Sequence, residues 1–340
     1  MTSVTRIDTV RLGQDGPEVG VQGFGAMGIS EFYGDTDEAA ARDTLDAALE
    51  AGVTLIDTAD IYGSGANEEF LAPFLAAHRD EVVLATKFAI ERDPAEPTRR
   101  AVRNDPAYIR KAVEGSLRRL GVETIDVYYM HRRDPEIPFA ESVGAMAELV
   151  QQGKVRHLGL SEVTGAELRE AHAVHPITAL QSEWSLFSRD VERSAVGAAA
   201  ELGVAFVPYS PLGRGFLTGA FADAAKDLSG SDFRRHQPRF TGENAERNAA
   251  LLDPVRKIAA AHGATPAQIA LAWVQRRAAV HGLTVVPIPG TRKRSRLLEN
   301  AAATRIVLTD AELAELEPIA SRVAGDRYPD MRFTSVGRED

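Results

Sequence analysis

The sequence of 340 residues contains no cysteine, and this absence excludes disulfide bonds, cysteine-ligated metal sites and thiol catalysis. It also lacks any uncharged apolar run of about 18 residues, the length that a membrane-spanning helix needs. The first residues, MTSVTRIDTV, lack the apolar core of a signal peptide. We therefore expect a cytoplasmic protein that has no membrane partner.

Positive charge is also scarce, with 39 lysine and arginine residues against 49 aspartate and glutamate residues and a formal net charge of -10. This balance argues against nucleic acid or an anionic membrane surface as the main partner. Hydrophobic residues make up 44% of the chain, which is enough to bury a sizeable core. The chain is large for one domain unless that domain is a barrel.

Short apolar segments alternate with amphipathic segments of helical period along the chain. Strands are predicted at 53–57, 82–86, 126–130, 155–160, 177–181, 204–208 and 283–287. Helices are predicted at 37–51, 66–79, 106–120, 139–152, 164–173, 190–202, 246–262, 266–278, 294–303 and 309–322. This order predicts parallel strands with right-handed crossovers. With a first strand near 21–24, it predicts an α/β fold, a (β/α)8 TIM barrel that forms a single domain over residues 1–340.

Three segments fall outside this alternation. Within residues 1–20, two short runs around Gln14-Asp15-Gly16 predict an N-terminal β-hairpin. Residues 89–105 and 217–245 are long, polar and without periodicity. Because each of these two follows a strand, we expect both to lie over the C-terminal face of the barrel, where long loops act as lids.

Three predicted strands end at ionisable residues, namely Asp57, Lys87 and His131. Adjacent parallel strands bring their C-terminal ends together. The Lys87 ammonium can therefore pair with the Asp57 carboxylate, which would be costly to bury alone. Tyr62 follows in the loop after Asp57. A neighbouring ammonium lowers the pKa of a phenol from about 10 and makes it a better proton donor. A neutral His131 can orient a carbonyl by hydrogen bonding, so the four residues predict a site that protonates a developing alkoxide.

Each residue also has a structural interpretation: a packing tyrosine, a structural ion pair or a histidine that only supports the fold. Their joint position at one end of one barrel favours the catalytic interpretation. Gly23, Gly25 and Gly28 match the dinucleotide-binding pattern G-x-G-x-x-G, but no helix is predicted to begin inside it. We therefore interpret these glycines as part of a loop after the first strand.

These features resemble the aldo-keto reductases. The resemblance is carried by LIDTADIYGSGANE (55–68), TKF (86–88), YYMHRRDP (128–135), HLGLSE (157–162), QSEWSL (181–186), PYSPLGRGFLTG (208–219) and IPGTRKRSRLLENAAA (288–303). The segments follow the family's order over nearly the whole chain. FGAMGISEFYG (24–34) and HRRDP are most similar to the bacterial and plant branch that includes pyridoxal and perakine reductases.

The resemblance implies reversible, NAD(P)H-dependent reduction of small-molecule aldehydes and ketones to alcohols. It implies that Tyr62 is the proton donor, that Lys87 and Asp57 tune it and that His131 orients the carbonyl. A branch that reduces carbon–carbon double bonds carries glutamate in place of this histidine. His131 therefore favours carbonyl substrates.

The resemblance also implies a cofactor site. Ser161 and Gln181 are expected to hold the nicotinamide amide, and Trp184 to stack beneath its ring. Many relatives carry Asn after this serine, whereas this chain carries Glu162, which leaves the side-chain amide contact open. Main-chain N–H groups after the seventh strand suit a pyrophosphate, with a simple tight turn as the alternative. The predicted cofactor-binding residues of this segment are Tyr209, Ser210, Pro211, Leu212, Gly213 and Gly215.

Residues 292–296, RKRSR, place four basic side chains in five positions. A solvated surface is one interpretation, but the segment enters a predicted helix N-terminus, where anions bind and cations are disfavoured. The resemblance assigns the adenosine half of the cofactor to Gly290, Thr291, Arg292, Arg296, Glu299 and Asn300. The two arginines are placed at the 2′-phosphate, so we predict NADPH/NADP+ rather than NADH.

The substrate is the least determined feature. Phe24, Met27, Tyr33 and Phe88 are predicted to line its pocket, with residues of the 217–245 loop or the 325–340 tail. This lining suggests an apolar or aromatic carbonyl compound, and no metal site is predicted.

Two alternatives remain open. One is an NADPH-binding sensor with little turnover, like the potassium-channel β subunits of the same fold. The other is a barrel aldolase with Lys87 as a Schiff-base nucleophile, which a pairing with Asp57 would disfavour because it keeps the lysine protonated.

Overall fold

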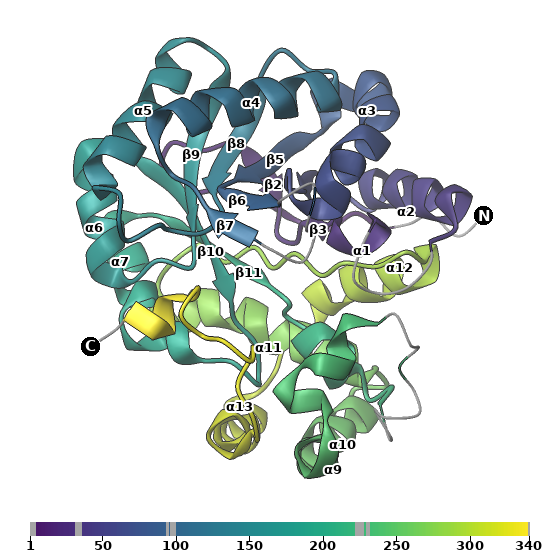
Figure 1. The fold of residues 1–340 in the computed structure, drawn as a ribbon. Coiled ribbons are helices and arrows are strands. Elements are labelled where there is room, and N and C mark those ends of the chain that lie inside the picture. The colour runs from purple at the N-terminus through teal and green to yellow at the C-terminus, as the bar shows by residue number, and fades with distance from the viewer. Residues whose placement is uncertain are drawn as a thin grey trace.

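A parallel sheet that nearly closes on itself forms the centre of the protein (Figure 1). The computed structural model describes residues 5–30, 36–92, 95, 100–221, 228 and 232–338. Seven strands are hydrogen-bonded in the order β11-β10-β9-β8-β5-β4-β3. They are β3 (Phe24–Gly25), β4 (Leu55–Asp57), β5 (Val83–Phe88), β8 (Ile125–Met130), β9 (Val155–Ser161), β10 (Ile177–Glu183) and β11 (Ala205–Tyr209).

The extended segment 284–288 closes the gap between β11 and β3. The Phe206 N–H donates to the Thr284 carbonyl at 2.8 Å, and the Gly23 N–H donates to the Pro287 carbonyl at 2.9 Å. The eighth predicted strand therefore occupies its expected place, although only an isolated bridge, Phe206 to Val285, joins it to β11. The predicted (β/α)8 barrel is confirmed.

Helices surround the barrel on the outside (Figure 1). They are α2 (Glu38–Glu50), α3 (Ala66–His78), α4 (Pro106–Leu120), α5 (Phe139–Gln151), α6 (Gly165–Val174), α7 (Ala195–Leu202), α9 (Gly242–Ala250), α10 (Asp253–Ala261), α11 (Pro266–His281), α12 (Arg294–Ala302) and α13 (Asp310–Leu316), with the short α1 (Met27–Ser30). Single 3-10 turns are η1 (Tyr62–Gly65), η2 (Arg79–Glu81), η3 (Asp190–Arg193), η4 (Gly213–Thr218), η5 (Phe233–His236), η6 (Pro238–Phe240), η7 (Ala303–Arg305), η8 (Glu317–Arg322) and η9 (Ser335–Arg338). No helix in the described part of the chain has the length and apolarity to cross a membrane.

The ends of α4 show how capping residues set the limits of a helix. The Asp105 carboxylate accepts a hydrogen bond from the Tyr108 N–H at 3.0 Å, which satisfies one free donor of the first turn. Pro106 occupies the first turn, where its missing N–H costs nothing. Gly121 ends the helix with φ +66°, a conformation that favours glycine.

Four predicted segments differ from the structure. The helix predicted at 190–202 is η3 followed by α7, with Ser194 between them in a non-helical conformation (φ −144°, ψ −45°). The helix predicted at 246–262 is two helices, α9 and α10, because Pro254 in the first turn of α10 cannot continue the preceding helix. The helix predicted at 309–322 ends as α13 at Leu316, followed by η8 with Pro318 in its first turn. The 89–105 connection contains an antiparallel hairpin, β6 (Ile90–Arg92) and β7 (Arg100–Val102), which its polar sequence concealed.

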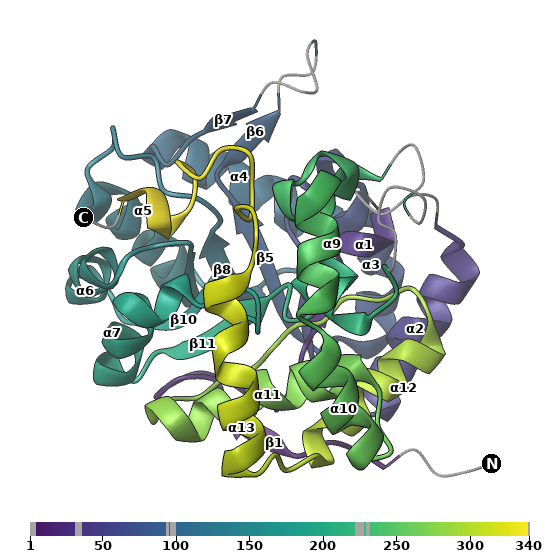
Figure 2. The same ribbon diagram turned by 90° about the horizontal axis from the view of Figure 1, so that it is seen from below.

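The predicted N-terminal hairpin is β1 (Thr9–Arg11) and β2 (Glu18–Gly20). Leu12 and Val19 are fully buried against the inward-facing residues of the barrel strands. In Figure 2, β1 lies at the end of the barrel opposite to β6 and β7. The hairpin therefore closes the N-terminal end of the barrel, and the C-terminal strand ends remain for the site.

Candidate active site

The four predicted catalytic residues come together at the C-terminal end of the barrel. Asp57 ends β4, Lys87 lies near the end of β5, His131 follows β8, and Tyr62 begins η1. Asp57, Tyr62 and His131 line a cavity of about 820 Å³, whereas Lys87 is fully buried beside it. The barrel topology alone produces this convergence, because all these strands are parallel.

Lys87 is the central residue of the group. Its Nζ lies 2.5 Å from Asp57 Oδ1, 2.7 Å from the Thr58 carbonyl and 3.4 Å from the Tyr62 hydroxyl. Burial lowers the pKa of Lys87 and raises the pKa of Asp57, while the pairing opposes both shifts. Gln181 donates to the other Asp57 oxygen at 2.8 Å. The carboxylate therefore has a partner on each oxygen, as a buried charge requires.

The pKa of Tyr62 differs from the sequence prediction. Burial, followed by the Asp57 charge, raises the pKa of Tyr62 well above 10, and only the Arg132 charge ranks as an opposing influence. The prediction of a lowered pKa considered the Lys87 ammonium, which is paired with Asp57 as expected, but not the burial of the phenol itself. The phenol consequently stays protonated at neutral pH and is available as a proton donor.

His131 lies edge-on to Tyr62, with ring centroids 5.9 Å apart and the ring planes at 86°. Burial, and then the charges of Arg132 and Lys87, lower the pKa of His131 well below 6.5. The imidazole is therefore neutral at physiological pH. A neutral imidazole can donate a hydrogen bond to a carbonyl oxygen without becoming charged.

Most of the predicted cofactor residues line the same cavity. They are Gln181, Tyr209, Ser210, Pro211, Leu212, Gly215, Gly290, Thr291, Arg292, Arg296, Glu299 and Asn300. Gly213 and Ser161 lie close by without lining it: Gly213 begins η4, and Ser161 accepts a hydrogen bond from Arg132 at 3.2 Å. The cavity thus runs from the four catalytic residues to the basic segment 292–296.

The segment after β11 has the backbone of an anion site. Ser210 (φ +47°), Gly213 (φ +55°), Arg214 (φ +58°) and Gly215 (φ +90°) all have left-handed conformations. Leu212 is right-handed (φ −95°, ψ +16°) and precedes the left-handed Gly213. Such a pair turns successive N–H groups to one side and forms a concavity that binds anions. Strained non-glycine residues such as Ser210 and Arg214 concentrate at functional sites. This part of the chain therefore fits a pyrophosphate.

Trp184 does not occupy the predicted place beneath a nicotinamide ring. It is fully buried outside the barrel, its ring packs on Phe206 at 4.9 Å, and its indole N–H donates to Glu192 at 2.9 Å. Trp184 directly follows Glu183, the last residue of β10, and its ring enters the core between the barrel and the helices. Tyr209 is the aromatic residue that lines the cavity here.

The predicted substrate-pocket residues are only partly correct. Met27 lines the cavity, and Tyr33 lies outside the described residues. Phe24 and Phe88 are fully buried in the core between barrel and helices, and Phe88 stacks on Tyr128 at 5.0 Å. Because Lys87 and Phe88 are consecutive on one strand, the inward direction of Lys87 sends Phe88 outward. From the long loop, Thr218, Ala220, Phe233, Arg234 and Gln237 line the cavity.

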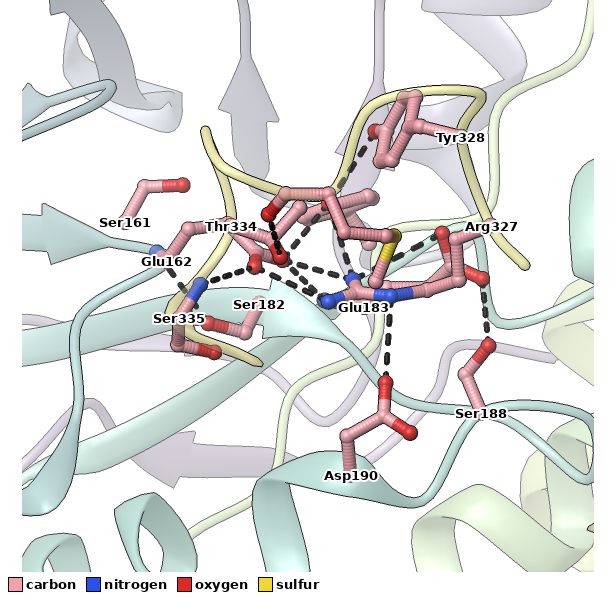
Figure 3. A network of polar contacts seen from close by, with 12 residues as sticks. Ser161, Glu162, Ser182, Glu183, Ser188, Asp190, Arg327, Tyr328, Thr334 and Ser335 are labelled. Atoms are coloured by element: carbon pink, nitrogen blue, oxygen red, sulfur yellow. Dashed lines mark hydrogen bonds and ion pairs between the residues drawn. The ribbon is translucent and has the colours of Figure 1, made fainter. Parts of the chain in front are cut away.

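Glu162 anchors the C-terminal tail (Figure 3). It is fully buried, and Arg327 donates to both of its oxygens at 2.9 and 3.2 Å. The Tyr209 hydroxyl at 2.7 Å and the Ser335 N–H at 3.2 Å also donate to it. The Arg327 and Arg132 charges hold the pKa of Glu162 far below its usual range. The Glu162 side chain therefore binds the tail. In the relatives that carry Asn at this position, the side-chain amide is expected to contact the nicotinamide instead.

The 325–340 tail, which the sequence predicts as part of the pocket, contributes Tyr328 to the cavity. Tyr328 lines the cavity, its hydroxyl lies 3.3 Å from that of Tyr209, and the Arg214 guanidinium lies 4.3 Å above its ring. Arg327 pairs in addition with Asp190 at 3.2 Å. The sequence pointed to the tail as a whole but did not single out Tyr328 within it.

A parallel barrel whose C-terminal end holds a tyrosine, a lysine–aspartate pair and a neutral histidine beside a long cavity has the layout of an oxidoreductase. The model of the Aldo/keto reductase family matches residues 23–321, and the chain belongs to that family. It is therefore an oxidoreductase of the class that acts on carbonyl groups.

Solved structures agree with this assignment. The glycerol dehydrogenase AKR11B4 from Gluconobacter oxydans has 30% sequence identity and a TM-score of 0.83, over 97% of this chain and 99% of that chain. The thermostable aldo-keto reductase Tm1743, in complex with the inhibitor epalrestat, has 29% identity and a TM-score of 0.72, over 92% and 100%. The aldo-keto reductase AKR11C1 from Bacillus halodurans, in a holo form, has 25% identity and a TM-score of 0.74, over 96% and 100%.

Proposed function

We propose that this chain reduces an aldehyde or ketone to an alcohol with NADPH, and that Tyr62 donates the proton. The observation that carries the proposal is the Tyr62 hydroxyl, which lies at the cavity wall 3.4 Å from Lys87 Nζ. When bound, NADPH supplies a hydride to the carbonyl carbon. The Tyr62 O–H supplies the proton to the oxygen, and the product is an alcohol and NADP+.

The other catalytic residues prepare this proton transfer. Asp57 fixes Lys87, and Lys87 Nζ is placed to donate a hydrogen bond to the phenolate oxygen that remains after Tyr62 has given up its proton. His131 donates a hydrogen bond to the carbonyl oxygen and orients it toward Tyr62.

We propose NADPH rather than NADH from the basic end of the cavity. Arg292, Lys293 and Arg296 line it, next to the N-terminus of α12. Arg294 points elsewhere, because it pairs with Asp43 and Glu50 on the surface. Among the described residues, no carboxylate forms an ion pair with Arg296, so the 2′-phosphate is a suitable partner.

The alternative functions have less support. Lys87 is fully buried and does not line the cavity, so a substrate cannot reach it to form the Schiff base of an aldolase. The complete set of catalytic residues favours turnover over a sensor role. The motifs FGAMGISEFYG and HRRDP support a place in the pyridoxal and perakine reductase-like branch.

Steady-state oxidation of NADPH tests the proposal, with 4-nitrobenzaldehyde, an α-dicarbonyl and pyridoxal as substrates. The proposal predicts turnover with at least one of them and a lower KM for NADPH than for NADH. Tight NADPH binding without turnover across a broad aldehyde panel would favour the sensor. Absence of NADPH binding would contradict both functions.

A further inference from the structure

Arg132 lines the cavity as the residue immediately after His131. One of its terminal nitrogens, Nη1, donates to the His131 carbonyl at 2.6 Å and to the Ser161 hydroxyl at 3.2 Å. Within the described ranges, no carboxylate forms an ion pair with the Arg132 guanidinium, and its Nε and Nη2 make no hydrogen bond to protein. The guanidinium therefore presents a positive charge and free donors to the cavity.

Neighbouring arginines are paired, which makes Arg132 unusual in its surroundings. Arg133 pairs with Glu167 at 3.4 Å and lies over the Phe139 ring. Arg327 occupies both oxygens of Glu162, the carboxylate whose charge also acts on Arg132. A partly enclosed cation without a partner is costly, unless a ligand supplies the anion.

The cavity as a whole carries more positive than negative charge, although the chain has a net charge of -10. Its described lining includes seven arginine or lysine residues and only two acidic residues, Asp57 and Glu299. Arg292, Lys293 and Arg296 lie at the cofactor end, and Arg214 and Arg234 pair with Glu183 and Asp232. Arg132 lies instead at the end where Tyr62 and His131 carry out the chemistry.

We propose that Arg132 binds an anionic group of the substrate, so that the preferred substrates are aldehydes and ketones that carry a carboxylate or a phosphate. Arg132 can form a bidentate pair with either anion, which fixes the orientation as well as the charge of the substrate. Met27, Ile61 and Ile90 line the cavity and suit a short carbon skeleton between carbonyl and anion. This inference rests on the proposed reductase function and names its substrate class.

A different role for Arg132 would leave another signature. If the guanidinium only orients Ser161 for the nicotinamide, its loss weakens NADPH binding and lowers the reduction of all carbonyl compounds equally. If it binds substrate, its loss raises KM for anionic substrates alone.

Matched substrate pairs separate the two roles. Succinic semialdehyde is compared with its methyl ester, and glyceraldehyde 3-phosphate with glyceraldehyde, in wild type, Arg132→Met and Arg133→Met. We expect wild type to prefer the anionic member of at least one pair. Arg132→Met should lower kcat/KM for that member about 10- to 100-fold, the range of charge-assisted hydrogen bonds, through KM. The loss of kcat/KM for the neutral member should be clearly smaller, and the NADPH Kd should be retained. Arg133→Met should retain wild-type values for both members.

Several results would overturn the inference: no anionic preference in either pair, equal losses on both members, or a weaker NADPH Kd in Arg132→Met. A preference in one pair identifies carboxylate or phosphate as the recognised anion. Isothermal titration calorimetry tests the inference without turnover. It compares the affinities of 4-hydroxybutyrate and 4-hydroxybutanamide for the NADP+ complex. The proposed function fails if wild type reduces neither pair and none of 4-nitrobenzaldehyde, the α-dicarbonyl and pyridoxal. The inference is then decided by binding alone: it holds if 4-hydroxybutyrate binds more tightly than 4-hydroxybutanamide and loses this advantage in Arg132→Met.

Discussion

The buried pair of Glu162 and Arg327 should contribute strongly to stability. Both side chains are almost fully buried, with Glu162 0% and Arg327 2% exposed. Arg327→Met would leave the carboxylate without its counter-ion, although the Tyr209 hydroxyl and the Ser335 N–H would still donate to it. Removal of one partner from a buried pair costs about 3–5 kcal/mol of the free energy of unfolding.

Urea denaturation measures this loss as a lower midpoint at constant slope. The double variant Glu162→Gln, Arg327→Met should recover a large part of it, because no charge then remains buried alone. Arg332→Met is the matched control in the same tail, since its pair with Asp330 is on the surface and should not change the midpoint. The cycle of the two single variants and the double variant isolates the coupling.

Acidity gives this prediction a second test. The pKa of Glu162 is lowered in the folded protein, so the pair stabilises the fold above the ordinary glutamate pKa of 4.5. The contribution is lost as the pH falls from there toward the folded-state pKa. The difference between wild type and Arg327→Met should therefore be largest above pH 4.5 and shrink in acid. Additive losses in the double variant, or a loss in Arg327→Met no larger than in the surface control, would refute the reasoning.

Three further predictions follow from the site. Arg296→Ala should raise KM for NADPH about tenfold or more and leave KM for NADH nearly unchanged, because a charge-assisted phosphate contact is lost; equal changes for both cofactors would contradict it. The pKa of His131 is lowered, so kcat/KM for a neutral aldehyde should stay level as the pH falls from about 7.5 to about 6. A decline of kcat/KM in this range, with the ordinary histidine pKa, would contradict a neutral imidazole. Fluorescence titration should give an unchanged NADPH Kd for Trp184→Phe and a higher Kd for Tyr209→Leu, because of these two residues only Tyr209 lines the cavity. A higher Kd for Trp184→Phe with an unchanged Kd for Tyr209→Leu would instead support stacking of Trp184 on the nicotinamide.

The fold could be predicted from sequence because each of its signals is local. Alternating apolar and amphipathic segments set the barrel, and glycines such as Gly121 and Gly203 mark the helix ends with φ +66° and +65°. The strand ends then bring Asp57, Lys87 and His131 together without further information.

The sequence did not predict the role of a residue where that role depends on the direction of its side chain or on a partner far away in the chain. Residue type alone suggests a cavity role for Trp184 and Phe88, but both are buried in the core between barrel and helices. For Phe88 the reason is the alternation of side chains along β5. Glu162 and Arg327 are 165 residues apart, and no local pattern links them. The tail contact therefore required the structure.

The central claim is that Tyr62 gives the proton to the reduced carbonyl, and single-turnover oxidation of bound NADPH tests it most directly. Wild type and Tyr62→Phe are saturated with NADPH and mixed with one aldehyde that wild type reduces. We expect an unchanged NADPH Kd and a rate about 10²- to 10⁴-fold lower in Tyr62→Phe, the usual contribution of a positioned acid. A rate in Tyr62→Phe close to that of wild type would contradict it.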